Sequence, residues 1–169
     1  YNIPLSGLKT GSQSFNFDIG NDFFELFKES EIKEGNLAVS VTADKITSHI
    51  DLNIRIEGIV RICCDRCLEM FDYQLECDNR LLVRQGMMQD DSDPDIIFVP
   101  QEEHDLDISQ YLYEFIHLAL PIRRLHPDDA EGKSTCDPAM IEKLNEHIVI
   151  DNNPQDPRWD ELKKLIIDN

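Results

Sequence analysis

The residues most capable of chemistry in this chain are its cysteines, three of which fall within five positions: Cys63, Cys64 and Cys67. The Cys-x-x-Cys spacing of Cys64 and Cys67 is typical of a zinc knuckle, because a tight turn lets both sulfurs reach one ion. A structural zinc site needs four ligands. The only second pair that could complete it is His126 with Cys136, about sixty residues further along.

The same residues allow two other interpretations. The cysteines can be reduced thiols that pack as small apolar side chains, with His126 as an ordinary hydrogen-bonded loop histidine. They can also form a metal- or redox-responsive group. A thioredoxin-like site is disfavoured, because its Cys-x-x-Cys opens a helix, whereas residues 68–77 alternate as a strand does.

Two long strands are predicted on either side of these cysteines. Before them, apolar residues fall on even positions between Ile46 and Ile56, and polar residues on odd positions from Asp51 to Glu57. After them, odd positions from 71 to 77 are apolar and even positions are polar. This period of two indicates strands with one buried and one wet face, so the Cys-x-x-Cys should lie at a hairpin tip.

The N-terminal part is predicted to add strands around one short helix. Residues 2–19 should form an opening pair of strands that turns at residues 11–12. Asn21 is a good N-cap for a helix, whose apolar side three phenylalanines would supply as core anchors. These are Phe23, Phe24 and Phe27.

Two further strands and one turn follow from the same reasoning. Residues 37–41 alternate as a strand, and residues 43–45 are predicted to be the hairpin turn into the long strand after them. Residues 96–99 are a short apolar strand, expected at a sheet edge and closed by Pro100.

Three helices are predicted in the C-terminal half. Asp107 should cap the main one, whose stripe facing the sheet begins at Ile108 and ends near Pro121. Asp137-Pro138 and Asp156-Pro157 each signal the start of another helix. Trp159, one turn into the last helix, either anchors it on the sheet or serves as a docking residue.

Together these elements predict an α+β fold. We expect an antiparallel meander sheet that could curl toward a barrel, covered by a few helices, with a C-terminal helical segment. The predicted organisation is residues 1–125 as the sheet with its covering helices. Residues 126–169 would be a loop and helices packed on the same domain.

The charge of the chain indicates its class of partner. Its 169 residues include 34 Asp and Glu against 16 Lys and Arg, a formal net charge of −18. Such a field repels nucleic acid and favours a basic protein. Residues 86–107 carry eight acids and neither Lys nor Arg. Either this tract contacts a basic partner or it is a solvated loop. Its central acids are Asp90, Asp91, Asp93 and Asp95.

Other features narrow the class of protein further. No catalytic or phosphate-binding motif has its required spacing, so we expect no enzyme activity. No apolar run approaches a membrane span in length, and no secretory leader is recognisable. Five cysteines cannot all pair, which indicates a reducing compartment and hence a cytoplasmic location.

An ordered set of motifs resembles the YceD-like family, the large ribosomal RNA subunit accumulation proteins. The set runs from a strand into residues 64–68, through an acidic interval and an Asp-Leu-Asp helix ending at Leu120-Pro121, to Asp156-Pro157-Arg158-Trp159. It covers about residues 37–165. Some members carry two further cysteine pairs after the Leu-Pro. In this chain His126 stands where the first of those cysteines would fall, and Cys136 is the only cysteine beyond it.

The resemblance implies a non-enzymatic bacterial factor needed for accumulation of large-subunit (23S) ribosomal RNA. Joined to the charge, it suggests binding to a basic ribosomal protein or a pre-ribosomal particle. The alternative within binding functions is direct docking on RNA through arginines that converge on one face. Candidates for partner contact include Arg66, Arg123, Arg124 and Arg158, and the RNA alternative adds Arg61, Arg80 and Arg84.

Overall fold

The computed structural model describes residues 1–47, 49–86 and 96–148. Its centre is one five-stranded sheet, in which β2 to β5 form an antiparallel meander and β6 runs parallel to β5. In order across the sheet the strands are β2 (Gly11–Ile19), β3 (Glu34–Lys45), β4 (Ile50–Cys63), β5 (Met70–Gln85) and β6 (Ile96–Val99). The predicted α+β meander is confirmed. Within the described residues the sheet is open and does not close into a barrel.

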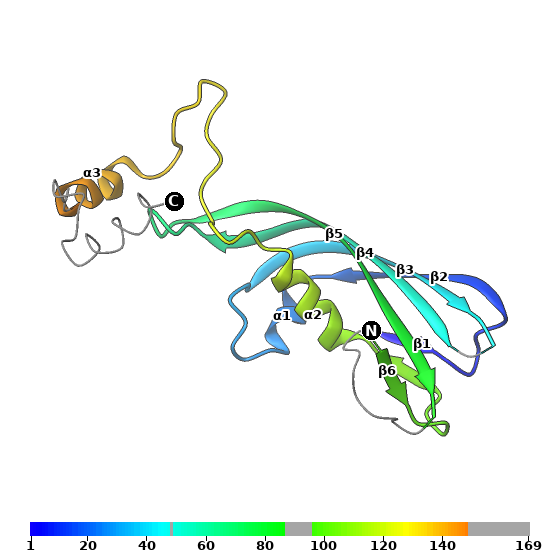
Figure 1. The fold of residues 1–169 in the computed structure, drawn as a ribbon. Coiled ribbons are helices and arrows are strands. Elements are labelled where there is room, and N and C mark those ends of the chain that lie inside the picture. Colours follow the sequence, from blue (N-terminus) through cyan, green and yellow to red (C-terminus); the bar gives the residue numbers. More distant parts are fainter. Residues whose placement is uncertain (48, 87–95, 149–169) are drawn as a thin grey trace, which may run out of the picture.

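Among the described elements, the helices α1 and α2 cover one face of the sheet and none covers the other (Figure 1). Helices α1 (Asn21–Glu25) and α2 (Ser109–Leu118) lie under the sheet, together with the two-stranded ribbon of β1 (Asn2–Pro4) and β7 (Asp105–Asp107). We call this the inner face and the opposite one the outer face. Helix α3 (Pro138–His147) lies beyond the tip of the long β4–β5 hairpin, away from the other helices.

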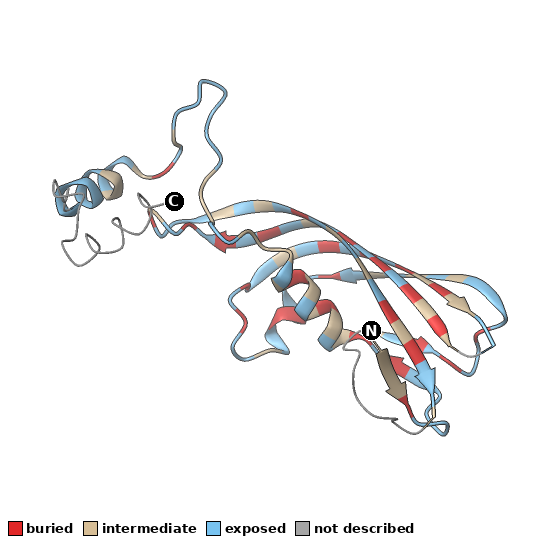
Figure 2. Ribbon diagram, in the orientation of Figure 1, coloured by how far each residue is buried: buried red, intermediate tan, exposed pale blue. Residues whose placement is uncertain are grey.

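The core lies between the inner face and the two covering helices. Buried and exposed residues alternate along β3, β4 and β5, as the banded colouring of Figure 2 shows. Ile54 and Ile56 of β4 are 2% and 0% exposed, and the predicted stripe residues Ile108, Leu112 and Ile116 are fully buried. The period-two pattern of the sequence therefore identified the buried face correctly.

Close packing in the sheet requires glycine at one position of β4. Gly58 has φ +149°, and it lies opposite Leu37 of β3 and Leu75 of β5. A Cβ there would stand 2.8 Å from the Cα of Leu37 and still closer to the carbonyl oxygen of Asn36. A side chain at residue 58 would thus collide with the neighbouring strand.

The predicted opening pair of strands is wrong in its pairing. β1 pairs with β7, and β2 begins at Gly11, where a turn was expected. Leu5 and Leu8, between the two strands, are buried, so the connecting segment follows the inner layer. Local alternation cannot reveal that a strand's partner lies about a hundred residues away.

Two local predictions around β3 also need correction. Gly20 is the N-cap of α1, whereas the side chain of Asn21 accepts a hydrogen bond from the backbone N–H of Gly35. Residues 43–45 belong to β3, and the chain turns after them, where the N–H of Ile46 donates to the carbonyl of His49. The core role predicted for Phe23 and Phe24 is confirmed.

Helices α2 and α3 start close to where they were predicted. Asp137 accepts a hydrogen bond from the N–H of Ala139 and caps α3. Asp107 stands one residue before the N-cap of α2, and its Oδ1 accepts from both the N–H and the hydroxyl of Ser109. None of the helices in the described ranges is long and apolar enough to cross a membrane.

Replacing Asp107 with alanine should destabilise the protein by about 1 kcal/mol at pH 7, the usual contribution of a helix-capping side chain. The hydrogen bonds from Ser109 hold the pKa of Asp107 below its ordinary value. A lowered carboxyl pKa stabilises the folded state above the unfolded pKa, and this contribution is lost as the pH falls through the folded pKa. The difference in unfolding free energy between wild type and variant should therefore shrink in acid. Chemical denaturation at pH 7 and at about pH 3 checks this. A difference that grows in acid would contradict it.

Candidate metal centre

The tip of the β4–β5 hairpin positions Cys64 and Cys67. The N–H of Cys64 donates to the carbonyl of Glu69, and the N–H of Leu68 donates to the carbonyl of Cys64. These bonds close a tight turn, in which Leu68 takes the left-handed conformation with φ +63°. Both sulfur-bearing residues are buried, at 0% and 2% exposed. The turn thus folds the two thiols inward.

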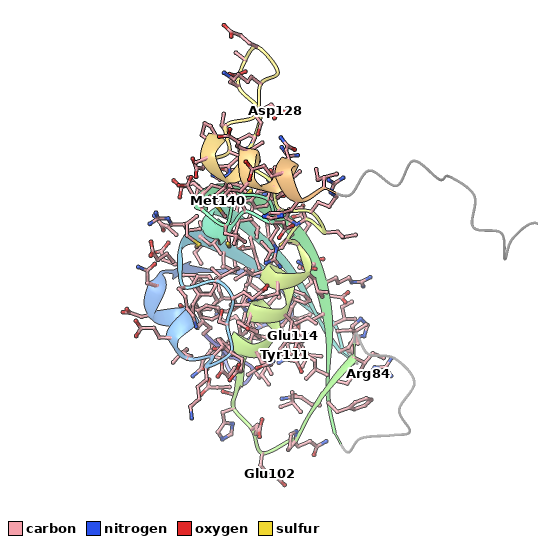
Figure 3. The ribbon with its side chains drawn as sticks, turned by 90° about the vertical axis from the view of Figure 1, so that its left-hand side faces the viewer. Arg84, Glu102, Tyr111, Glu114, Asp128 and Met140 are labelled. Atoms are coloured by element: carbon pink, nitrogen blue, oxygen red, sulfur yellow. The ribbon has the colours of Figure 1, made fainter. Side chains whose placement is uncertain are left out.

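A second turn brings His126 and Cys136 together. Between them the chain doubles back around Asp129, whose side chain accepts hydrogen bonds from the N–H groups of Glu131 and Lys133. The Thr135 hydroxyl donates to the carbonyl of Pro127 beside them. Figure 3 shows Asp128 at the base of the outermost turn of this loop and Met140 on α3. The sequence separation of ten between His126 and Cys136 is therefore spanned by a local hairpin.

The two pairs converge on one point. The Sγ atoms of Cys64 and Cys136 are 3.8 Å apart, and His126 Nδ1 lies 3.4 Å from the Cys67 Sγ and 3.7 Å from the Cys136 Sγ. All four ligand atoms lie within 4.8 Å of one another. We call Cys64, Cys67, His126 and Cys136 the cysteine–histidine cluster. The four residues singled out from the sequence are the four that the fold brings together.

The surroundings favour the thiolate form at Cys64 and disfavour it at Cys67. Burial raises the pKa of Cys64, but backbone N–H groups of Cys67, Arg66 and His126 donate to its sulfur and lower the pKa to about 6. Burial raises the pKa of Cys67, and hydrogen bonds from the N–H groups of Glu69 and Asp137 only partly oppose this. A negative sulfur at Cys64 is thus already stabilised by the turn.

Apolar side chains shield the cluster and polar contacts fix its two halves. Phe71, Leu125, Met140 and Ile141 pack against the sulfurs. Asp65 holds the second segment at the tip, because its N–H donates to the carbonyl of Arg124 and its carboxylate accepts from the N–H of Arg124, both at 2.7 Å. No sequence pattern predicts this pairing of residues 59 positions apart.

The donor atoms fit a structural zinc ion. In a tetrahedral site with Zn–S near 2.3 Å and Zn–N near 2.0–2.1 Å, the ligand atoms stand about 3.5–3.8 Å from one another. The separations of 3.4, 3.7 and 3.8 Å are close to these values, and all four ligand atoms lie within 4.8 Å of one another. Three sulfurs and one imidazole would fill all four positions around such an ion, as in structural rather than catalytic zinc sites.

Replacing Leu68 with glycine should stabilise the protein by about 0.5–1 kcal/mol, because the left-handed backbone conformation is sterically unfavourable for leucine but not for glycine. The leucine side chain is 66% exposed, so little apolar burial is lost. The free energy of unfolding, measured in denaturant, checks this. A clear loss of stability would show instead that the Leu68 side chain makes an important contact.

The other residues predicted to contact a binding partner differ in their exposure and in their hydrogen-bond partners. Arg123 is exposed. Arg66 is half-buried and its guanidinium donates to the hydroxyl of Ser134. Arg124 pairs with Glu31 at 2.8 Å. Asp90, Asp91, Asp93, Asp95, Arg158 and Trp159 lie outside the described residues.

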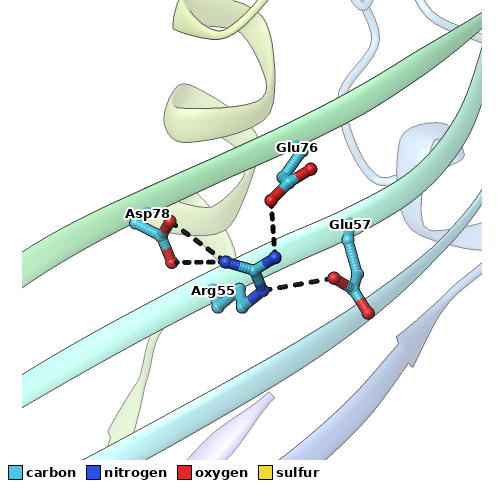
Figure 4. Close-up of polar contacts among 4 residues, drawn as sticks. All are labelled: Arg55, Glu57, Glu76 and Asp78. Atoms are coloured by element: carbon cyan, nitrogen blue, oxygen red, sulfur yellow. Dashed lines mark hydrogen bonds and ion pairs between the residues drawn. The ribbon is translucent and has the colours of Figure 1, made fainter.

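The structure also shows a charged network that the sequence did not single out. Arg55 of β4 donates to Glu57 on its own strand and to Glu76 and Asp78 on β5 (Figure 4). All four side chains are on the outer face, far from the cysteine–histidine cluster. Only the strand register brings them together, so a pattern of single positions could not reveal the network.

Comparison with protein families identifies the chain's relatives. The family model described as large ribosomal RNA subunit accumulation protein YceD matches residues 52–166, which is more than half of the chain. The matched range runs from β4 through α3 and contains the whole cysteine–histidine cluster. No match was found among curated proteins or among solved structures. The resemblance seen in the ordered motifs is confirmed, and the chain belongs to the YceD family of large ribosomal RNA subunit accumulation proteins.

Proposed function

We propose that this chain supports the accumulation of large-subunit (23S) ribosomal RNA as a non-enzymatic binding protein of the bacterial cytoplasm. Its partner would be a basic ribosomal protein, alone or in a pre-ribosomal particle. Membership of the family supports a role in ribosomal RNA accumulation, and the formal charge of −18 supports a positively charged partner. An anionic protein attracts cationic chains and repels the phosphate backbone.

Three of the arginines considered for direct RNA contact are already paired with carboxylates, which favours the protein partner. Arg61 pairs with Glu34 at 3.1 Å, and Arg80 pairs with Asp51 at 2.9 Å. Arg124 is also paired, as described above. Binding of RNA by counterion release needs cations that can neutralise phosphates. Arginines whose charges are already matched by carboxylates contribute little to it.

The cysteine–histidine cluster would serve this function by bracing the hairpin tip. A bound zinc ion would supply a cross-link between the tip and the segment that carries His126 and Cys136. The Asp65–Arg124 pairing and the packing of Met140 and Ile141 already join these two parts. The ion would therefore fix the position of α3 relative to the sheet.

Recovery of the chain's native partner tests the proposal. An affinity-tagged chain purified from its own cells at moderate salt should retain a basic large-subunit ribosomal protein, also after ribonuclease treatment. Ribosomal RNA without any basic protein would overturn the proposal. The charge predicts that the captured protein dissociates as the salt concentration rises.

A metal-responsive role is the second candidate, favoured by the arrangement of the three cluster sulfurs. Elemental analysis of protein purified without added metal separates the two roles. A structural site should return about one zinc ion per chain. A responsive site should be partly filled and follow the free zinc concentration.

A further inference from the structure

The two edge strands of the sheet differ in how they are protected against further pairing. An unpaired edge can pair with another chain, and proteins block such edges with short strands, proline, lysine or bulges. Strand β6, at one edge, has four residues and is followed directly by Pro100. Strand β2, at the other edge, has nine residues in continuous register with β3 and contains neither proline nor lysine. The edge of β2 therefore lacks the usual protection.

The hydrogen-bond pattern shows which backbone groups of β2 point away from the sheet. Both polar groups of a strand residue point to the same side, and successive residues alternate. After β3, the N–H of Ile46 donates to the carbonyl of His49, so even-numbered residues of β3 face β4 and odd-numbered ones face β2. Through the β2–β3 register, the even-numbered residues of β2 point outward. The carbonyl of Asp18 agrees with this, because it accepts a hydrogen bond from the hydroxyl of Tyr1, which is not part of this sheet.

Three residues present outward backbone groups along the edge of β2: Ser12, Ser14 and Asn16. Each offers one N–H and one carbonyl, and none of these groups has a hydrogen-bond partner among the described residues. The inner side of the same edge is apolar, because Phe15 and Phe17 pack on the core but stay partly exposed. One additional strand would bond the outward groups and cover both phenylalanines.

The composition of this edge indicates which strand fits it. Residues 10–17 carry no charge, although 30% of the chain is charged. A basic segment would find no carboxylate along these positions to select it, and an acidic segment would find no cation. The strand β2 of a second copy is itself uncharged over the same positions, and its serine, asparagine and glutamine side chains can hydrogen-bond with their own kind. The edge is therefore complementary to itself.

We propose that two copies of this chain pair through β2, antiparallel and about a two-fold axis at Ser14, so that their sheets join into one. In this register Ser14 faces Ser14 of the partner subunit, and Ser12 faces Asn16 of the partner subunit. The outward N–H and carbonyl groups of all three residues are then bonded. A register shifted by two would instead place Ser12 opposite Asp18, whose carbonyl already accepts from Tyr1.

Pairing about Ser14 also keeps like charges apart at the contact. Asp18 is the only charged residue of β2, and it would lie opposite Thr10 of the partner subunit, next to the cation of Lys9. Every other opposed pair within the two strands is uncharged. The remaining repulsion is the long-range one between two chains of net charge −18, and salt screens it. Dimerisation should therefore strengthen as the salt concentration rises.

A lysine placed on the two-fold axis tests the contact by sedimentation equilibrium. Ser14→Lys makes the chain less anionic, which by itself favours association, but the two new lysines would face each other across the axis. The variant should dimerise about tenfold more weakly than wild type. Ser40→Lys is the matched control, because residue 40 is exposed on β3 opposite Asn16 and the change in charge is the same. It should dimerise within about twofold of wild type.

An engineered charge pair tests the register. Ser12→Lys combined with Asn16→Asp keeps the net charge, and the new lysine and aspartate are too far apart on one strand to meet within a chain. Pairing about Ser14 brings them together between copies, so this variant should dimerise about threefold more tightly than wild type at low salt. Weaker dimerisation would contradict the register. A wild-type chain that stays monomeric at about 0.1 mM would overturn the proposal, and so would equal effects of Ser14→Lys and Ser40→Lys.

Discussion

Replacing Cys136 with serine is expected to reduce bound zinc from about one ion per chain to nearly none. Cys136 is the ligand whose sulfur stands 3.8 Å from that of Cys64, and it joins the C-terminal segment to the hairpin tip. Binding free energies of structural zinc in small sites are on the order of 10 kcal/mol, so losing one ligand is costly. The contacts of Met140 and Ile141 with the cluster should then loosen, because no side chain of α3 is fully buried among the described residues.

Elemental analysis and hydrogen exchange measure the two halves of this prediction. Amides of residues 126–147 should exchange faster in the variant, whereas amides of β3 and β4 should not change. Cys63→Ser is the matched control. Cys63 is exposed on the outer face beside Cys64, and its thiol donates to the carbonyl of Leu68 outside the cluster. Equal zinc loss from both variants would contradict the four-ligand assignment.

Replacing Gly58 with alanine should destabilise the protein by on the order of 3–5 kcal/mol, enough to unfold many domains of this size. Two effects add. The backbone at φ +149° is strained for any residue with a side chain, and the added Cβ would collide with the β3 backbone at Asn36 and Leu37. Neither β3 nor β4 can move away without breaking the backbone hydrogen bonds between the two strands.

Two other glycines separate these effects. Gly86 has a similar φ of +144°, but no atom lies within 4 Å of a Cβ placed there, so Gly86→Ala should cost only the strain, about 1 kcal/mol. Gly7 has no positive φ, and a Cβ placed there would make only ordinary contact with Pro4 at 3.9 Å, so Gly7→Ala should be nearly neutral. Urea unfolding of the three variants should rank them in this order. A Gly58→Ala variant no less stable than Gly86→Ala would show that the strands are not in contact as described.

The sequence predicted those parts of the fold that depend on local periodicity. The long strands β4 and β5 were found because their apolar residues must alternate to bury one face, and α2 because Ile108, Leu112 and Ile116 share one side of a helix. Pairing between distant segments was not predictable. β1 pairs with β7, and β6 is parallel to β5, because of tertiary contacts that no local pattern records.

The cysteine–histidine cluster was predicted for a different reason. Cysteines and histidines are few in this chain, so only His126 and Cys136 could complete a zinc site with Cys64 and Cys67. The charged network around Arg55 could not be found this way, because acids are abundant. Which of them meet is set by register: Arg55 lies opposite Asp78, and Glu57 lies opposite Glu76. A shift of one residue would have sent the arginine into the core.

The 72 positions between Cys64 and Cys136 also order the events of biosynthesis. At roughly 5–20 residues per second, several seconds pass between the synthesis of the first sulfur ligand and the last. The meander needs only neighbouring hairpins, so it can form during that interval. Two cysteines alone would hold zinc weakly, so a newly made molecule would have a finished sheet before a zinc ion could bind all four ligands.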